Sequence, residues 1–185
     1  DIINERIEFK TPTFQTLLRE LKSYTYHVGE QFNKLVLYQN RGYTMATGGL
    51  HSVDRPELFV STDDYYYGDA DVSSYYPNLV INEGVSPAHL AYAAFQAIAK
   101  FITAERMSNK ALAKAAKKMH DAEKMTFYGT GADAYKIVAN SGLFGKLGYD
   151  GWMLDLKAMY QTTINGQLYL MMLIENYTYL FEYRE

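Results

Sequence analysis

The spacing of apolar residues predicts a short helix near the start of the chain. Phe14, Leu17, Leu18 and Leu21 follow one another at helical intervals, so they share one helical face. Thr13, just before them, is of a residue type that caps helix N-termini. We therefore expect a helix within residues 1–30 that is capped at Thr13.

The pattern changes to that of strands between residues 32 and 81. Short runs rich in aromatic and aliphatic residues are separated there by Gly, Asn and Pro. Four strands are predicted, at residues 32–38, 43–45, 57–60 and 65–71. The last rests on the alternation of Tyr65, Tyr67, Asp69 and Asp71, and Ser74 with Pro77 is expected to end it.

From residue 86 onward the pattern is helical. Ser86 and Pro87 resemble an N-cap followed by proline in the first turn. The first predicted helix runs from there to about residue 124, with a break near Ser108 and Asn109. A second helix is predicted over 132–141, after a turn at 129–131, and Gly145 and Gly148 close it. A third is predicted over 156–183, with Gly166 as a weak point. Strands followed by helices predict an α+β fold.

Composition narrows the possible classes of protein. The 185 residues are 48% hydrophobic, carry a formal net charge of −3 and include no cysteine, which excludes disulfides and thiolate metal sites. The most apolar stretch, residues 168–174, is too short to span a bilayer, and the N-terminus does not have the pattern of a signal peptide. We therefore expect no membrane partner and a cytoplasmic location.

Two segments carry candidate chemistry. Asp71, at the end of the predicted strand, could hold a divalent cation or could merely cap a turn. About 65 residues later, Lys136 opens a segment that continues through Asn140 to Gly145. Taken alone, Lys136 is more typical of a solvated helical surface.

A basic stripe lies between these two segments. Arg106, Lys110, Lys114 and Lys117 fall on one helical face, Lys118 lies nearby, and no acidic residue separates them. Like charges at this spacing destabilise an isolated helix, so the stripe favours an anionic partner. The other reading is a solvated basic face.

Read together, the two segments resemble the first and second polymerase motifs of family B DNA polymerases. Those motifs are Asp-x-x-Ser-Leu-Tyr-Pro and Lys-x-x-x-Asn-Ser-x-Tyr-Gly. The matching segments are Asp71-Val72-Ser73-Ser74-Tyr75-Tyr76-Pro77 and Lys136-Ile137-Val138-Ala139-Asn140-Ser141-Gly142-Leu143-Phe144-Gly145. The residues of these two segments are most similar to those of phage and prophage replicases.

This resemblance implies an architecture and an activity. Residues 1–85 would form the N-terminal part of a palm with an antiparallel sheet, residues 86–150 a helical fingers hairpin, and residues 151–185 a long helix returning to the palm. The activity would be template-dependent transfer of a nucleotide from a dNTP to a primer 3′-hydroxyl by two Mg²⁺ ions. A phage origin would place the protein in the cytoplasm of a bacterial host.

The resemblance also assigns roles within the first motif. Asp71 would bridge the metal ions, with the carbonyl of Val72 as a second metal contact. Ser74 would leave backbone N–H groups free for triphosphate oxygens. Tyr76 would lie beneath the deoxyribose and exclude ribonucleotides, unless it is a core tyrosine.

The remaining roles concern the triphosphate and the base pair. Arg106 and Lys110 would bind the triphosphate. Lys136 would reach the same phosphates and could donate a proton to the leaving pyrophosphate. Asn140 would line the pocket near the base or sugar, and Gly145 would allow close approach of the nascent base pair.

The chain departs from the family pattern in two main respects. The second motif is one residue longer than usual, with Phe144 in the aromatic place, and no Asp-Thr-Asp hairpin supplies a second metal carboxylate. We therefore expect a fragment that does not extend a primer alone. Its partners would be dNTP, primer-template DNA and the remainder of the polymerase.

Two other functions remain open at this stage. The basic helix and the tyrosines could belong to a binding module without chemistry, which grips a nucleic acid or an acidic protein. Alternatively, Asp63, Asp64, Asp69 and Asp71 could serve a metal-dependent hydrolase. In that case Asp69 and Asp71, two apart on a strand, would form the metal pair.

Overall fold

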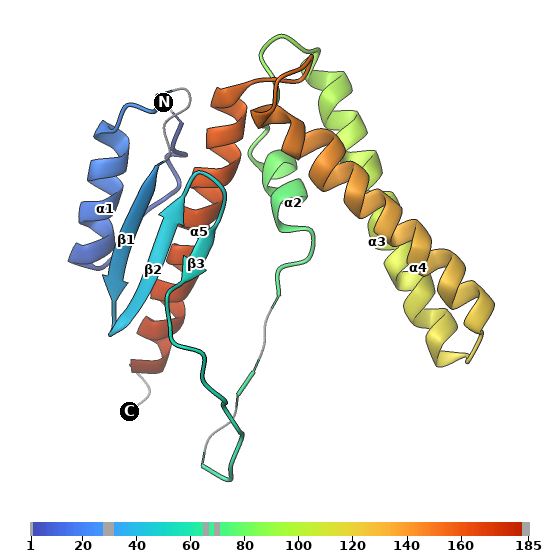
Figure 1. Ribbon diagram of the computed structural model, residues 1–185, viewed down its shortest axis with the longest axis horizontal. Coiled ribbons are helices and arrows are strands. Elements are labelled where there is room, and N and C mark those ends of the chain that lie inside the picture. The colour runs from blue at the N-terminus through green and yellow to red at the C-terminus, as the bar shows by residue number, and fades with distance from the viewer. Residues whose placement is uncertain (1, 28–31, 65–66, 69–70, 183–185) are drawn as a thin grey trace. The chain divides into compact units, whose positions relative to one another are not determined.

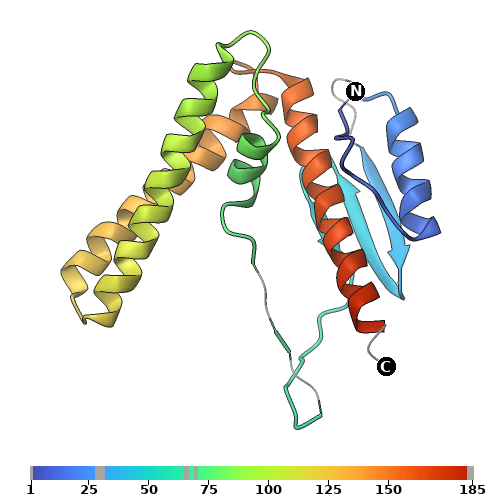
Figure 2. The same cartoon turned by 180° about the vertical axis from the view of Figure 1, so that it is seen from behind.

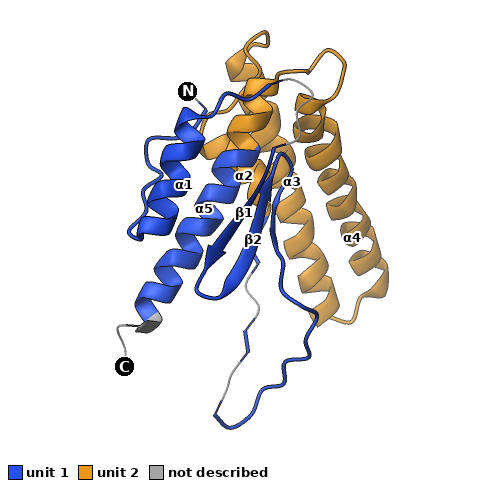
Figure 3. Cartoon of the chain, turned by 60° about the vertical axis from the view of Figure 1, so that its left-hand side comes forward, with its two compact units in different colours: residues 1–73, 163–185 blue, residues 74–162 orange. Residues whose placement is uncertain are grey.

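The computed structural model describes residues 2–27, 32–64, 67–68 and 71–182. The chain divides into two compact units, which are described separately (Figure 3). Unit 1 comprises Asp1–Ser73 and Thr163–Glu185, and unit 2 comprises Ser74–Thr162. The described residues form helices and one small antiparallel sheet, so the predicted mixture of α and β structure is confirmed.

Unit 1 contains the sheet. Helix α1 (Pro12–Ser23) is followed by strands β1 (Asn33–Tyr38), β2 (Arg41–Ala46) and β3 (Leu50–Ser52), which pair antiparallel in the order β1-β2-β3 (Figure 1). Gln39 and Asn40 connect β1 to β2 with φ of 47° and 59°. Two successive left-handed residues give the turn that matches the twist of a hairpin.

The helix predicted near the N-terminus is confirmed, with its start corrected. Phe14, Leu17 and Leu21 are buried, as their spacing predicted. The N-cap is Thr11 rather than Thr13, because Pro12 occupies the first helical position, where a missing N–H costs nothing. Glu175 of helix α5 (Leu156–Glu182) accepts hydrogen bonds there from the backbone N–H of Thr11 at 2.8 Å and of Lys10 at 2.9 Å.

The strand predictions are correct only for the first hairpin. β1 and β2 lie at the predicted positions, but residues 57–60 form no strand, and the short β3 was not predicted. The apolar side chains of Leu58, Phe59 and Val60 are exposed, so their run does not reflect a buried strand. Of the predicted strand 65–71, residues 65, 66, 69 and 70 lie outside the described residues, and Tyr67, Gly68 and Asp71 are not in a strand.

Unit 2 is helical. Helix α2 (Tyr75–Asn82) leads to the long helix α3 (Tyr92–Lys118), which pairs with α4 (Ala122–Ile137); Figures 1 and 2 show α3 and α4 side by side as an antiparallel hairpin. His120, with a φ of 55°, reverses the chain between them. Asp121 then caps α4 by accepting a hydrogen bond from the backbone N–H of Lys124 at 3.0 Å.

Several predictions for the helices in this region are wrong. Helix α3 begins at Tyr92, not at Ser86 and Pro87, runs unbroken through Ser108 and Asn109, and ends at Lys118 rather than near residue 124. The Asn109 side chain donates to the carbonyl of Glu105 at 2.8 Å, so its polar group is satisfied inside the helix. Residues 129–131 form no turn but lie within α4, and α4 ends at Ile137 rather than at residue 141.

The chain stays helical after α4 but changes its winding. Segment η1 (Val138–Phe144) is a π-helix and η2 (Gly145–Gly148) is a 3₁₀-helix, which ends at Gly148 as predicted. The following helix α5 starts at the predicted residue and runs to the end of the described chain. Its first residues belong to unit 2 and the remainder to unit 1.

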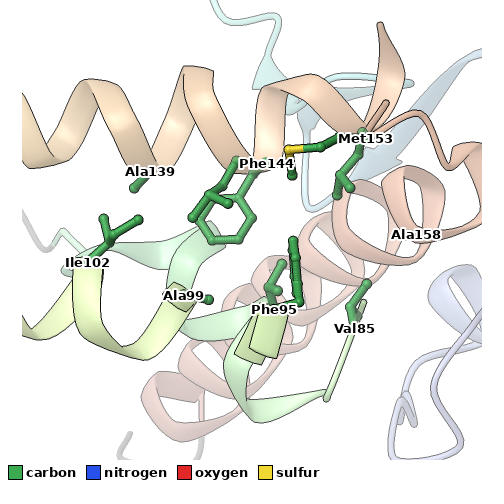
Figure 4. Packing of buried hydrophobic residues seen from close by; sticks show 11 residues of the cluster. Val85, Phe95, Ala99, Ile102, Ala139, Phe144, Met153 and Ala158 are labelled. Carbon is green, nitrogen blue, oxygen red and sulfur yellow. The ribbon is translucent and has the colours of Figure 1, made fainter. Parts of the chain in front are cut away.

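One apolar cluster holds unit 2 together. Figure 4 shows Phe95, Ala99 and Ile102 of α3 packed against Ala139 and Phe144 of η1. The cluster is completed by buried residues from α2, η1, η2, the loops and the start of α5, namely Val80, Leu143, Leu147, Val85, Met153 and Ala158. This core fixes α2 and the second-motif segment against the same end of α3.

Candidate functional site

The first motif spans the junction between the two units. Asp71 and Val72 are exposed and lie just before α2, near the end of the first segment of unit 1, which closes at Ser73. Ser74, the first residue of unit 2, is buried and adopts the left-handed conformation with φ 50° and ψ 48°. The expectation that Ser74 and Pro77 end a strand is wrong: Ser74 is the N-cap residue of α2, and Pro77 lies in the first turn of that helix.

The Ser74 hydroxyl joins the first motif to the basic stripe. Arg106 of α3 donates a hydrogen bond from Nη1 to Ser74 Oγ at 2.6 Å, and Ser74 Oγ also lies 3.7 Å from the sulfur of Met107. The Arg106 side chain is half-buried. A guanidinium has five donors, and one bond to Ser74 leaves others for an anion. The structure therefore brings two of the predicted site residues into direct contact.

The remaining cations of the stripe are accessible. Lys110, Lys114 and Lys117 are exposed on α3, and the ion pairs found among the described residues include none of them. Lys118, also exposed, ends the helix. Their positive charge is therefore uncompensated within the described part of unit 2.

The second motif lies where α4 changes into η1. Lys136 is exposed in the last turn of α4, and Asn140 is exposed in the π-helix. The helix predicted over residues 132–141 is α-helical only as far as Ile137, because the backbone widens into a π-helix from Val138 onward. π-helical turns are rare and occur frequently at functional sites.

Gly145 is required by the backbone at this junction. The carbonyl oxygen of Asn140 lies 2.7 Å from where a Cβ would stand at position 145, and it accepts a hydrogen bond from the backbone N–H of Gly145. A side chain there would displace the end of the π-helix. The structure gives Gly145 this local role, while its predicted contact with a base pair stays a prediction.

The register of the hairpin places Lys136 near Arg106. Gly131 of α4 lies against Asn109 of α3, since a Cβ at position 131 would meet Asn109 Oδ1 at 2.7 Å. Because the helices are antiparallel, Lys136, which follows Gly131, and Arg106, which precedes Asn109, lie at nearly the same height. Counting about 100° per residue from Ala132, the buried residue of α4, puts Lys136 on the side of the hairpin that also carries Lys110.

Tyr76 is neither exposed nor a full core residue. It is half-buried in the first turn of α2, its ring centroid lies 5.4 Å from that of Tyr75, and burial raises the pKa of its phenol above the ordinary value. The phenol is therefore neutral across physiological pH.

The metal assignment receives no further support from side-chain geometry. In the parts of the chain that the structure describes, no group of three His, Cys, Asp or Glu residues is placed to hold a metal ion. Asp69, the partner of Asp71 in the hydrolase alternative, lies outside the described residues. Asp71 itself is not in a strand, so the alternation on which that pair was based is not found.

Sequence reasoning missed two buried polar residues, Gln167 and Glu175, and the half-buried Asp155. Gln167 is fully buried and pairs with both the N–H and the C=O of Ala46, at 3.1 and 2.7 Å. Glu175 caps α1, and Asp155 accepts from the backbone N–H groups of Ala88 at 2.8 Å and Ala158 at 2.9 Å. The signal available for Gln167 and Glu175 was a polar side chain within a strongly apolar helix, which must find a partner when buried.

No protein-family model, curated protein or solved structure matches the chain. None of the described helices is long and apolar enough to cross a bilayer.

Proposed function

We propose that the chain forms the nucleotide-binding part of a template-dependent DNA polymerase. The supporting observation is the 2.6 Å hydrogen bond from Arg106 to Ser74, which joins the first motif to the basic stripe inside unit 2. By helical periodicity, the second-motif residue Lys136 falls on the same side of the paired helix α4. Two helices would thus supply one group of cations beside the start of α2, Arg106 and Lys110 from α3 and Lys136 from α4.

This arrangement suits a triphosphate with a divalent cation. Arg106, Lys110 and Lys136 would neutralise the phosphates, and the start of α2 would offer backbone N–H groups to their oxygens. Asp71, immediately upstream on the chain, would hold Mg²⁺ with the carbonyl of Val72. Mg²⁺ needs only one or two carboxylates when substrate phosphates complete its coordination.

The Mg²⁺ chemistry would follow the two-metal scheme. Mg²⁺ held by the Asp71 carboxylate and the Val72 carbonyl would supply charge stabilisation for the attacking 3′-hydroxyl and the leaving pyrophosphate. The sequence contains no Asp-Thr-Asp hairpin for the second metal carboxylate. We therefore expect this chain to bind Mg·dNTP but not to extend a primer without the rest of the polymerase.

Equilibrium binding of Mg·dATP to the purified chain tests the proposal. Arg106→Gln, Lys110→Gln and Lys136→Gln should each weaken binding by about tenfold or more, since a hydrogen bond to a charged group contributes about 1.5–3 kcal/mol. Lys100→Gln removes an exposed lysine of α3 outside the stripe and should have no effect. The proposal fails if the chain shows no saturable binding, or if Lys100→Gln weakens it as much as the others do.

A further inference from the structure

The basic stripe is longer than a triphosphate needs. Arg106 contacts Ser74 beside α2, but α3 continues for three further turns to Lys118. Figures 1 and 2 show that this distal part of the hairpin projects beyond α2, with only α4 packed against it in unit 2. Lys114, Lys117 and Lys118 are exposed there.

Helix geometry separates these lysines from the nucleotide. A rise of 1.5 Å per residue puts Lys114 about 12 Å and Lys117 about 16 Å along the axis from Arg106. A triphosphate held by Arg106, Lys110 and Lys136 does not extend that far along α3. The distal lysines are therefore left to bind a second anion.

We propose that Lys114, Lys117 and Lys118 bind the sugar-phosphate backbone of a single nucleic-acid strand. This inference rests on the proposed function, because it takes the proximal cations to be used by the dNTP. Lys114 and Lys118 are separated by about 6 Å along the helix axis. One strand carries a phosphate about every 3.4 Å along the axis of a duplex, so the three lysines fit a run of about three phosphates.

The chemistry of the surface also favours phosphate contacts without base recognition. The three distal residues are lysines, which act as flexible point charges, and the only arginine of the stripe is the one engaged with Ser74. The formal net charge of the whole chain is −3, so binding to a polyanion depends on this local stripe. Binding should therefore be sequence-tolerant and strongly dependent on salt.

The test compares two ligands and two triple variants of the whole chain. The ligands are Mg·dATP and a labelled oligothymidylate of about 16 nucleotides, the upper end of a single-strand site. The first variant is Lys114→Gln with Lys117→Gln and Lys118→Gln. The matched control replaces three exposed lysines elsewhere, Lys22→Gln with Lys100→Gln and Lys157→Gln.

We expect the distal variant to bind the oligonucleotide about tenfold more weakly, with the slope of log affinity against log salt reduced by about 2, as three lost single-strand phosphate contacts require. Its Mg·dATP affinity should stay within about twofold of the parent's, and the control should match the parent for both ligands. Loss of dATP binding in the Arg106 and Lys110 variants tests the proposed function separately.

Three results would overturn the inference. The first is that the distal variant binds the oligonucleotide as tightly as the parent does. The second is that the control weakens binding as much as the distal variant, which would mean that the effect comes from net charge alone. The parent could also bind polyglutamate as tightly as the oligonucleotide and lose both ligands in the distal variant. That result would assign the stripe to an acidic protein partner instead.

Discussion

Ser74 shows how one residue can link a sequence motif to a distant helix. Its left-handed backbone turns the chain abruptly into α2, and its buried hydroxyl accepts the hydrogen bond from Arg106. The left-handed conformation is unfavourable for a serine, so surrounding contacts must hold it. Such conformations cluster at functional sites, which agrees with the place of Ser74 in the first motif, where it contacts Arg106 of the basic stripe.

Tyr76 gives the first prediction at this scale, which tests the proposed sugar discrimination. Tyr76→Ala should bring the affinities of the chain for ATP and dATP closer together, because the ring that would clash with a 2′-hydroxyl is gone. Tyr76→Phe keeps the ring and should keep the discrimination. Binding of both nucleotides is measured beside thermal unfolding. An unchanged ATP/dATP ratio with a lowered melting temperature would mean that Tyr76 is only a packing residue.

Asp155 gives a second prediction, which concerns pH. Partial burial disfavours its ionised form, but hydrogen bonds from the backbone N–H groups of Ala158, Ala88 and Lys157 outweigh this and hold its pKa below the ordinary value. Asp155→Ala should lower the free energy of unfolding at pH 7 by about 1–2 kcal/mol, the cost of losing a helix cap. A carboxylate whose pKa is lower in the folded state stabilises the fold at pH values above its unfolded-state pKa. This stabilisation is lost as the pH falls through its folded-state pKa.

The difference in unfolding free energy between Asp155→Ala and the parent should therefore shrink below about pH 4, near the ordinary carboxyl pKa. Denaturant unfolding at neutral and acid pH measures it. Asp150→Ala, at an exposed neighbouring aspartate, is the control and should change little at either pH. A difference that stays constant into acid would show that the carboxylate charge does not contribute.

At the scale of the elements, glycine chemistry explains why the hairpin was misjudged from the sequence. Gly129 and Gly131 signalled a turn, but the structure keeps both inside α4. Gly131 is needed because Asn109 comes close to it, whereas a Cβ at position 129 would meet nothing within 4 Å. The true reversal, at His120, has no Gly or Pro to mark it, so local sequence could not locate it.

This difference predicts opposite results for two alanine substitutions. Gly129→Ala should raise the free energy of unfolding by about 0.5–1 kcal/mol, because alanine loses less entropy than glycine in a helix. Gly131→Ala should raise the free energy of unfolding by less than Gly129→Ala does, or should lower it, because its methyl group meets Asn109 Oδ1. Chemical denaturation of both variants measures these changes in the free energy of unfolding. A destabilising Gly129→Ala would contradict the helical assignment of residues 129–131.

The π-helix allows a similar comparison. Gly145→Ala places a methyl group 2.7 Å from the carbonyl oxygen of Asn140, whereas the nearest atom to a Cβ at Gly142 is Val138 Cγ1 at 3.8 Å. Gly145→Ala should therefore cost about 1–3 kcal/mol of unfolding free energy, and Gly142→Ala much less. Urea unfolding of the pair checks this. Equal effects would mean that the junction tolerates side chains.

At the scale of the whole molecule, the sequence predicted the fold class, the first hairpin, α1 and α5 because each has a strong local period or turn signal. It did not predict the winding of η1 or the unbroken α3, since both depend on packing around Phe95, Ala139 and Phe144. The candidate site was partly predictable. Spacing marked the stripe, but the link from Arg106 to Ser74 joins residues 32 positions apart and needed the tertiary fold.

Glu175 carries the last prediction, because it connects the two ends of the chain within unit 1. Its carboxylate is only 1% exposed and accepts from the N–H of Lys10 and from the N–H and hydroxyl of Thr11, more than 160 residues away. Glu175→Ala leaves those donors without an acceptor. An unsatisfied buried donor costs about 1–3 kcal/mol, so we expect a loss of about 2–4 kcal/mol in unfolding free energy.

Hydrogen exchange locates this loss. Exchange should quicken in α1, in the sheet and in α5 beyond residue 163, and stay unchanged in α3 and α4, because Glu175 and its partners all belong to unit 1. Glu57→Ala, at an exposed glutamate of the same unit, serves as the control and should leave exchange as in the parent. Equal acceleration in both units would show instead that the chain unfolds as one cooperative body, with the shared helix α5 transmitting the loss of the cap from one unit to the other.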